Sequence, residues 1–241
     1  MNVILTVGEN LEDDQILWRY MDLAKFLSLL KQNALWLARV DTFRDKHEGR
    51  FPDEMKNIIE KAYAEYSDDD PSPVRDADDF QDYLVKNTFV SCWHENSSEN
   101  MVMWEIYGRD NNAVAIQTTV KNIKNNINTS GLTGHSLNLK DINYKNADEV
   151  QGVLRYEDCF FIKRRHFSFE QEVRISLDTY LRHNPTKKTP YGHKLPINTR
   201  GFIDKIIVHP DSPDWFLEVI KSIIEKYEIY VPVERGAYGM K

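Results

Sequence analysis

Apolar residues recur at two spacings along the chain, and each spacing predicts one kind of element. Alternation with polar residues is typical of strands, and recurrence every three or four positions is typical of helices. The predicted strands cover residues 15–20, 35–40, 88–93, 113–118, 136–144, 167–175, 203–208 and 229–233. The predicted helices cover residues 23–30, 52–66, 100–107 and 211–227, with a weaker one at the start of 120–134. Because strands and helices interleave without a regular repeat, we expect a mixed α+β fold with a mainly antiparallel sheet and flanking helices.

Two stretches interrupt this pattern within one predicted domain, residues 1–241. Residues 52–86 are predicted to form a helical and acidic insertion. Its second half, residues 67–82, holds seven aspartates and two prolines, a composition typical of an exposed excursion. Residues 182–199 are rich in proline, lysine and histidine, and the length of this stretch predicts a lid or a binding loop.

Composition favours a soluble, cytoplasmic protein. The chain has 241 residues and is 41% hydrophobic, which is ample for a packed core without disulfides. Cys92 and Cys159 follow no metal-ligand spacing, and so few cysteines are typical of a reducing compartment. The sequence shows neither a basic leader nor an apolar run of membrane-spanning length, so we expect no membrane association.

Charge narrows the range of expected partners. The formal net charge of -7 disfavours broad nucleic-acid binding, which depends on neutralising phosphates with lysine and arginine. The densest positive cluster, Lys-Arg-Arg-His at residues 163–166, is suited to steering a phosphorylated small molecule or an RNA end. The same cluster also fits a solvated loop or a partner for an acidic face.

The segment 167–175 carries the densest candidate chemistry. On a strand, Glu170, Glu172 and Arg174 share one face. Two carboxylates held side by side on a rigid strand, with Phe167 just upstream, suit a reaction in which positive charge develops on the substrate. The alternative is the solvated face of an antiparallel strand, whose charges pair with neighbouring strands.

Common catalytic motifs offer no simpler answer. The sequence contains no P-loop, G-x-G-x-x-G, G-x-S-x-G or H-E-x-x-H motif. Cys92 and His94 share a strand face, as a thiol nucleophile and its base would. A buried, inert cysteine is the more common arrangement and is the one we expect.

A metal-dependent hydrolase is a further alternative. Four potential ligands lie close together in the loop after the second predicted strand: Asp41, Asp45, His47 and Glu48. Oxygen donors of this kind favour magnesium, calcium or manganese. A turn whose aspartates bond their own backbone accounts for the same residues, and we assign no metal ligand.

Four pieces of sequence resemble an uncharacterised bacterial family known only as a domain of unknown function. In order, they are Trp18-Arg19-Tyr20, then Phe43 with Asp45 and Glu48, then Ser91-Cys92-Trp93 followed by Met103-Trp104 and Tyr107, and finally Glu170-x-Glu172-x-Arg174. The resemblance spans most of the chain. The chain departs from the family at residues 44–46, which are Arg-Asp-Lys in place of Asn-Asp-Pro, and at Ala113, where glycine is common. The resemblance implies no established activity.

A second resemblance is to ADP-ribosyltransferases. Arg19 on an early strand, Ser91 on a middle strand and Glu172 with Glu170 on a late strand resemble the Arg, Ser and Glu-x-Glu order of that family. The resemblance implies NAD as a substrate, with Glu172 facing the oxocarbenium-like state that forms as nicotinamide leaves the ribose. It also implies that Glu170 activates the acceptor, that Arg19 holds a diphosphate oxygen, and that Ser91 braces the ribose or Glu172.

These observations lead to one hypothesis and two alternatives. We expect a polar cleft around the four residues of the second resemblance to bind a small anionic, nucleotide-like ligand, with NAD as the candidate substrate for ADP-ribosyl transfer. Trp93, Tyr107 or Phe167 would give nicotinamide a stacking face, although core packing also explains Tyr107. Lys163 and Arg174 are further candidate ligand contacts. The alternatives are a noncatalytic binding or regulatory module, open to a protein partner, in which the same charges form a buried structural network, and the metal-dependent hydrolase.

Overall fold

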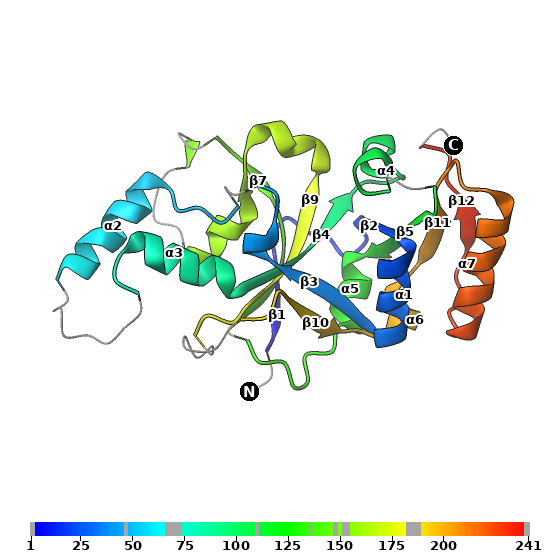
Figure 1. Cartoon of the computed structure of the whole chain (residues 1–241), viewed down its shortest axis with the longest axis horizontal. Helices are drawn as coiled ribbons and strands as arrows, with labels where there is room; N and C mark the ends of the chain where they lie inside the picture. Colours follow the sequence, from blue (N-terminus) through cyan, green and yellow to red (C-terminus); the bar gives the residue numbers. More distant parts are fainter. Residues whose placement is uncertain are drawn as a thin grey trace.

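One large sheet organises the molecule (Figure 1). The computed structural model describes residues 3–45, 48–65, 74–108, 111–134, 136–146, 149–150, 155–181 and 189–238. Within these ranges, ten strands join the sheet: β1 (Leu5–Val7), β2 (Ile16–Asp22), β3 (Ala34–Arg39), β4 (Thr88–Glu95), β5 (Ala113–Thr119), β6 (Ser136–Asp141), β9 (Glu172–Asp178), β10 (Gly192–Pro196), β11 (Lys205–Val208) and β12 (Val233–Arg235). Two short strands, β7 (Asn143–Tyr144) and β8 (Ile162–Lys163), pair with each other.

The strand order confirms the predicted fold class. The sheet runs β1-β6-β9-β4-β2-β5-β11-β12, and β3, with β10 beside it, branches from β4. Only the outer pairs β1-β6 and β11-β12 are parallel, and the remaining pairs of the large sheet are antiparallel. The central strand β9 lies between β4 and β6, so every one of its side chains is buried. The protein is therefore a single mixed domain with a mainly antiparallel sheet.

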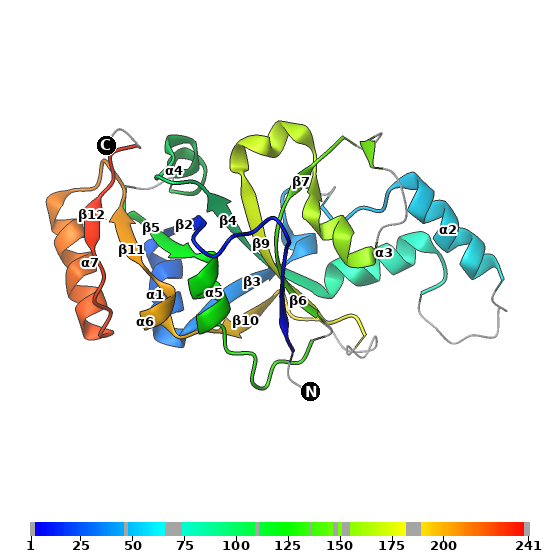
Figure 2. The same ribbon diagram turned by 180° about the vertical axis from the view of Figure 1, so that it is seen from behind.

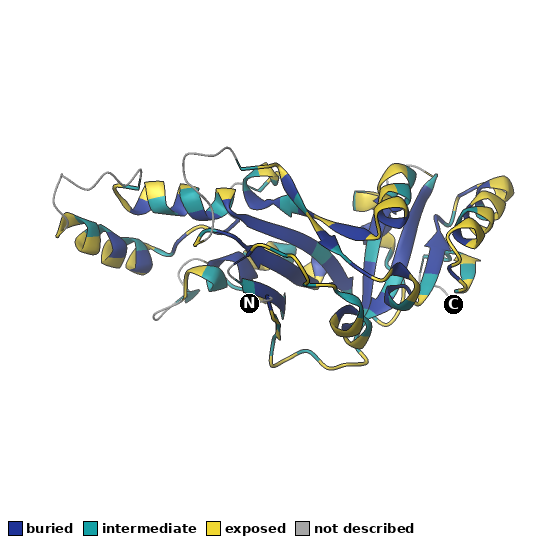
Figure 3. Ribbon diagram, turned by 90° about the horizontal axis from the view of Figure 1, so that it is seen from below, coloured by how far each residue is buried: buried dark blue, intermediate teal, exposed yellow. Residues whose placement is uncertain are grey.

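Four helices complete the main hydrophobic core. They are α1 (Leu23–Gln32), α5 (Val120–Asn126), α6 (Thr199–Phe202) and α7 (Asp214–Lys226). Phe26 of α1, Phe202 of α6 and Phe216 of α7 pack with strand residues such as Leu17 and Trp93. Figure 2 shows the side of the molecule on which α5 and β1 lie in front, and Figure 3 shows that the strands are largely buried while the outer faces of the helices are exposed.

Two smaller clusters cover the other faces of the strands. The first packs α2 (Asp53–Ala64), α3 (Ala77–Lys86) and the 3-10 helix η3 (Tyr156–Phe161) against Val90 and Ile142, and α2 and α3 project from one end of the molecule (Figure 1). The second places Trp104 of α4 (Met101–Tyr107) against Trp18 and Tyr20. Within the described ranges, no helix is both long and apolar enough to cross a membrane.

The predicted insertion at residues 52–86 is helical, because it contains α2 and α3. Its stretch 67–82 is not an exposed excursion throughout, because α3 begins at Ala77 and buries Ala77 and Gln81. Asp76 caps this helix by accepting a hydrogen bond from the backbone nitrogen of Asp79 at 2.7 Å. Aspartates at a helix start satisfy free backbone N–H groups and complement the helix dipole, so the same composition serves a helix. Residues 67–73 of the predicted excursion lie outside the described residues.

The predicted loop at residues 182–199 also contains regular structure. Residues 192–196 form β10, which pairs with β3 along its full length. The alternation of apolar and polar residues is weak in this segment, which contains lysine and proline, so the sequence did not predict a strand. It is a strand because β3 supplies its hydrogen-bonding partners. Residues 182–188 lie outside the described residues.

A fork in the sheet opens beside β4. Along one edge, β4 pairs with β9 from Thr88 to His94. Along the other edge it pairs with β3 only at residues 89–90 and with β2 only at residues 94–95. The ladder is therefore interrupted at residues 91–93, where β2 and β3 diverge. Helix α1 joins these two strands, and Asp22 caps its start.

We expect Asp76→Ala to lower the free energy of unfolding by about 1 kcal/mol, because it removes the side chain that caps α3. Urea denaturation of the wild type and the variant checks this value. Asp76→Ser keeps a capping oxygen and should retain most of the stability. An equal loss in both variants would contradict the capping role.

Candidate functional site

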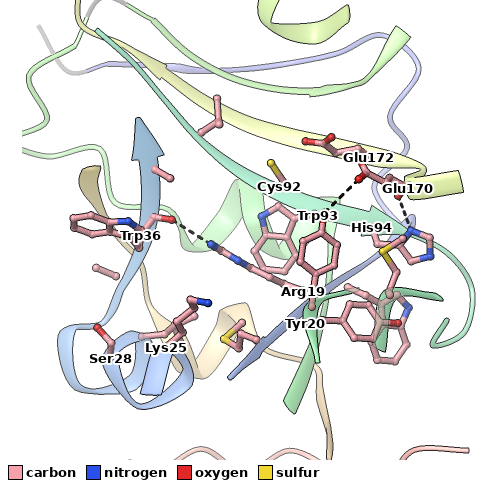
Figure 4. Close-up of a pocket in the computed structure, with 18 of the residues that line it drawn as sticks. Arg19, Tyr20, Lys25, Ser28, Trp36, Cys92, Trp93, His94, Glu170 and Glu172 are labelled. Atoms are coloured by element: carbon pink, nitrogen blue, oxygen red, sulfur yellow. Dashed lines mark hydrogen bonds between the residues drawn. The ribbon is translucent and has the colours of Figure 1, made fainter. Parts of the chain in front are cut away.

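A cavity of about 550 Å³ lies at the fork (Figure 4). Its volume is in the range of small-molecule sites, roughly 300–1,000 Å³. The walls come from β2, α1, β3, β4, the end of α4 and the start of β9. The lining residues that carry charge or an aromatic ring include Arg19, Lys25, Trp36, Trp93, His94, Tyr107, Glu170, Glu172 and Lys194.

Arg19 crosses the gap between the two branches of the fork. Its Nη1 donates to Ser91 Oγ at 2.5 Å and its Nη2 to the carbonyl oxygen of Trp36 at 3.2 Å, and Figure 4 shows the side chain extended toward Trp36. Burial lowers the pKa of Arg19, yet an arginine keeps its proton near neutral pH. No carboxylate in the described part of the chain pairs with this guanidinium. Among the described residues, the cavity therefore holds a cation that no carboxylate compensates.

Ser91 and Trp93 hold Arg19 in place. The indole Nε1 of Trp93 donates to Ser91 Oγ at 3.1 Å, and the Trp93 ring lies 5.7 Å from Arg19 Cζ and 5.6 Å from the ring of Phe202. Both residues are almost fully buried. The prediction that Ser91 braces Glu172 does not fit this geometry. The predictions that Ser91 braces the ribose and that Trp93, which lines the cavity, offers a stacking face stay predictions. Strand alternation places Ser91 on the opposite face of the sheet from Glu172, and the protein itself covers the Trp93 ring.

The two glutamates reach the cavity from different elements. Strand β9 begins at Glu172, whereas Glu170 ends the 3-10 helix η4 (Arg165–Glu170). The predicted strand over residues 167–175 is therefore wrong in its first half. Gln171 lies between the glutamates with a φ of 38°, in the left-handed region that turns the chain sharply. Because of this turn, both carboxylates line the same cavity.

A buried ionic network holds Glu172. Arg174 donates Nε to Oε1 of Glu172 at 2.5 Å and Nη2 to Oε2 at 3.1 Å, and Lys163 Nζ lies 3.0 Å from the same Oε2. Lys163 also contacts Glu170 at 2.5 Å, and Glu48 lies 3.4 Å from Lys163 and 2.8 Å from Arg174. The solvated strand face is excluded, because Arg174 is 0% exposed and Glu172 is 4% exposed. Among these five groups, three carboxylates face two cations, which leaves one excess negative charge.

The network separates the pKa values of the two glutamates. Burial by itself raises the pKa of Glu172, but Arg174 and Lys163 outweigh it and bring that pKa to about 2. Burial raises the pKa of Glu170, and Lys163 offsets this only in part. Glu172 therefore stays ionised at neutral pH, while Glu170 is the better proton acceptor. Two neighbouring carboxylates with separated pKa values are typical of acid–base chemistry in a site.

Cys92 and His94 support the glutamates. Burial, together with the charge of Glu172, raises the pKa of the Cys92 thiol well above its ordinary value. A protonated thiol is a poor nucleophile, so the raised pKa favours the inert cysteine that we expected, although the side chain is half-buried and not fully buried. His94 donates from Nδ1 to the backbone carbonyl of Glu170 at 2.7 Å, and burial lowers the pKa of His94. The neutral imidazole therefore braces the turn at Gln171.

The aromatic residues divide into those that line the cavity and those that do not. Tyr107 lines it, and its hydroxyl donates to Glu170 Oε1 at 3.4 Å. Phe167 instead lies beneath Lys163 and Arg164, 4.8 and 5.6 Å from their charged groups, away from the cavity lining. Trp36 lines the cavity and is 50% exposed, and sequence reasoning missed it. The alternation of residues 35–37 could have indicated this position, because a tryptophan between two inward-facing leucines of a strand lies on the opposite face.

The basic cluster at residues 163–166 is divided among acidic partners. Lys163 turns into the ionic network. Arg164 pairs with Asp45 at 3.1 Å and Arg165 pairs with Glu149 at 2.7 Å. These three basic side chains therefore pair with acidic groups of the chain itself, which was one of the alternatives for this cluster.

The loop at residues 41–48 does not gather its carboxylates. Asp41 pairs with Arg39 at 2.6 Å, Asp45 pairs with Arg164, and Glu48 belongs to the ionic network. Within the described ranges, no group of three histidine, cysteine, aspartate or glutamate residues is placed to hold a metal ion. His47 lies outside those ranges. The described carboxylates give the hydrolase alternative no support.

Comparison with known proteins identifies no sequence family. No family model matches the chain and no curated protein matches it, so the resemblance to the uncharacterised bacterial family gains no support. Among solved structures, the chain is similar to Thermus sp. 2.9 DarT in complex with NAD+, with carba-NAD+ and with ADP-ribosylated ssDNA, at 9%, 9% and 10% identity and TM-scores of 0.40, 0.43 and 0.39. These matches cover 94%, 94% and 99% of this chain and 98%, 97% and 98% of the other. A likeness this distant assigns no function to the chain, and the expectation of no broad nucleic-acid binding stays a prediction.

We expect Glu172→Gln to lower the free energy of unfolding by about 3 kcal/mol at pH 7, because it breaks the buried ion pairs of this carboxylate with Arg174 and Lys163. The pKa of Glu172 is lowered to about 2 in the folded protein, against about 4.3 in an unfolded chain. Its stabilisation is therefore present above the unfolded value and disappears as the pH falls toward the folded value.

Denaturant unfolding at a series of pH values measures this loss. The difference between wild type and variant should shrink as the pH falls from about 4.3 to about 2. Glu218→Gln, which removes an exposed pairing with Lys221, serves as the control and should change stability little. A difference that stays constant over this pH interval would contradict the role of the ionised carboxylate.

Proposed function

We propose that this chain binds NAD in the cavity at the fork, breaks the bond between nicotinamide and ribose, and transfers ADP-ribose to an acceptor. One observation carries the proposal. A single cavity presents the uncompensated guanidinium of Arg19 together with the carboxylates of Glu170 and Glu172. NAD has the matching distribution of charge, because its diphosphate is anionic and its nicotinamide ring is cationic.

The cation end of the cavity suits the diphosphate. The guanidinium of Arg19 is fixed by Ser91 and by the carbonyl of Trp36, so it is ordered before a ligand arrives. A preorganised arginine binds phosphate oxygens through several N–H donors at a small further entropic cost. Lys25 and Lys194 add positive charge to the same cavity.

The carboxylate end suits the reacting ribose. As the bond between C1′ and the nicotinamide nitrogen breaks, the electron pair leaves with nicotinamide and positive charge develops on the ribose. Glu172 is ionised at neutral pH and is fixed by Arg174, so it stabilises this charge without reorganising. The acceptor then attacks C1′, and its proton passes to Glu170, whose pKa is raised. The products are nicotinamide, the ADP-ribosylated acceptor and one proton.

Lys163 and Arg174 act as positioning residues in this scheme. They contact Glu172 from the side of the network that also holds Glu48. Their charges keep the Glu172 carboxylate ionised inside the protein, where burial would otherwise favour its protonated form. Lys163 lies between the two glutamates, so it also reduces their mutual repulsion.

A noncatalytic binding module is the second candidate. The observation in its favour is the burial of the network, since Arg174 and Glu172 are both nearly inaccessible. Buried ion pairs of this kind also occur with a purely structural role. Glu48 allows the two candidates to be separated, because it belongs to the same network but does not line the cavity at the fork.

We expect NAD to raise the melting temperature of the wild type and nicotinamide to be released from it. Glu172→Gln should lose nicotinamide release by orders of magnitude, because it removes the anion that faces the developing charge. Glu48→Gln should lose a similar amount of stability and keep most of the release. Thermal-shift titration and an assay of free nicotinamide measure both effects at a temperature where all three proteins are folded.

The pattern of loss in the two variants decides between the candidates. Equal loss of release in both variants would indicate that the network acts only through stability. A wild type that binds NAD and releases no nicotinamide would favour the noncatalytic module. The absence of any thermal shift would contradict both the substrate and the site.

We expect Arg19→Gln to weaken binding of ADP-ribose roughly tenfold or more, since it removes charge-assisted hydrogen bonds to the diphosphate. The melting temperature of this variant without ligand should equal or exceed that of the wild type, because a half-buried cation without a carboxylate partner is costly to desolvate. Isothermal titration calorimetry and thermal denaturation measure the two quantities. Unchanged affinity, or a large loss of stability, would indicate a structural role for Arg19.

A further inference from the structure

Trp36 is the one large exposed side chain of β3. The five other residues of this strand are buried or half-buried, whereas 50% of the Trp36 surface is exposed. Its indole lines the cavity at the fork, and the proposed reaction assigns it no part. An indole presented to a cavity offers a flat apolar face on which another ring can stack.

The surrounding backbone makes room for this ring. A β-carbon built on Gly192 of β10 would overlap the six-membered ring of Trp36, so glycine lets the indole rest against the neighbouring strand. Ala34 and Ala38 lie on either side of Trp36 on the same strand face, and both line the cavity with small side chains. The ring is therefore supported by β10 and flanked by open space.

The position of Trp36 indicates which part of a ligand it meets. Its carbonyl oxygen accepts a hydrogen bond from Arg19, so the ring adjoins the anion-binding guanidinium. Figure 4 shows Trp36 and the glutamates on opposite sides of the cavity, with Arg19 between them. In NAD the adenine and nicotinamide groups stand at opposite ends of the diphosphate. With nicotinamide at the glutamates and the diphosphate at Arg19, the adenine lies at Trp36.

We propose that Trp36 is the stacking platform for the adenine base of the ligand, with Gly192 as the residue that positions the ring. Lys194, opposite Trp36 in the strand register, and Lys25 bring positive charge to this end of the cavity. The inference rests on the proposed function for the orientation of the ligand, while stacking itself requires no reaction. Base–aromatic stacking is a substantial part of nucleotide affinity, because every base has a π-face.

Calorimetric titration with two half-ligands tests the platform. ADP carries the base and the diphosphate, and nicotinamide mononucleotide carries the other half of NAD. Trp36→Leu should raise the Kd for ADP roughly tenfold or more and leave the Kd for nicotinamide mononucleotide within about twofold of the wild-type value. Trp36→Phe keeps an aromatic face and should retain most of the ADP affinity.

Two further variants separate stacking from general effects. Gly192→Ala should weaken ADP binding in the same direction as Trp36→Leu, because the added methyl group displaces the indole. Trp215→Leu removes another exposed tryptophan, on α7 and outside the cavity lining, and should leave both affinities unchanged. Thermal denaturation confirms that each variant is folded before it is titrated.

Three outcomes would overturn the platform: no binding of ADP to the wild type, equal ADP affinity in the wild type and Trp36→Leu, or a loss confined to nicotinamide mononucleotide. The last result would place nicotinamide at Trp36. The two proposals can fail separately. ADP binding that depends on Trp36, in a protein that releases no nicotinamide, retains the base site and rejects the transferase. If nicotinamide is released but the ADP affinity does not depend on Trp36, the transferase is retained and the base site at Trp36 is rejected.

Discussion

The guanidinium of Arg174 is fully buried at the centre of the sheet. A buried cation needs carboxylates and hydrogen-bond acceptors beside it, because water cannot solvate its charge. Its partners come from distant parts of the sequence. Glu172 belongs to the same strand, Glu48 comes from the loop after β3, and the carbonyl of Phe160 accepts a further hydrogen bond at 2.6 Å. Lys163 then joins the carboxylates. One buried charge thus draws several segments together, and the excess negative charge of the group lies at the cavity wall.

The cavity holds the guanidinium of Arg19 apart from the carboxylates of Glu170 and Glu172. Arg19 starts on the main-core face of β2, whereas Glu172 lies on the other face of the sheet. The interrupted ladder at residues 91–93 lets the Arg19 side chain cross toward the cavity, where Ser91 and the carbonyl of Trp36 hold it. Rigid strands prevent the guanidinium and the carboxylates from collapsing onto one another. A fold that maintains such a separation loses some stability and gains a site prepared for a ligand with both charges.

Prediction from the sequence was reliable where a pattern is local and strong. The apolar stripe of residues 211–227 became α7, and the alternation of residues 88–93 became β4. It was wrong where a distant partner decides the structure. Residues 192–196 are a strand because β3 pairs with them, and Glu170 leaves the strand because Gln171 takes a left-handed conformation. Neither effect leaves a periodic signal in the sequence.

The amino-acid pattern alone was enough to predict the fold class, most of the elements, and the grouping of Glu170, Glu172 and Arg174 as the region of unusual charge. These follow from hydrophobic periodicity and from residues close together in the chain, which act through local geometry. The contact of Arg19 with Ser91 in place of Glu172, and the position of Trp36 at the cavity, became visible only in the folded molecule. Those contacts depend on the order of strands and on a missing stretch of ladder, and both result from packing between segments far apart in sequence.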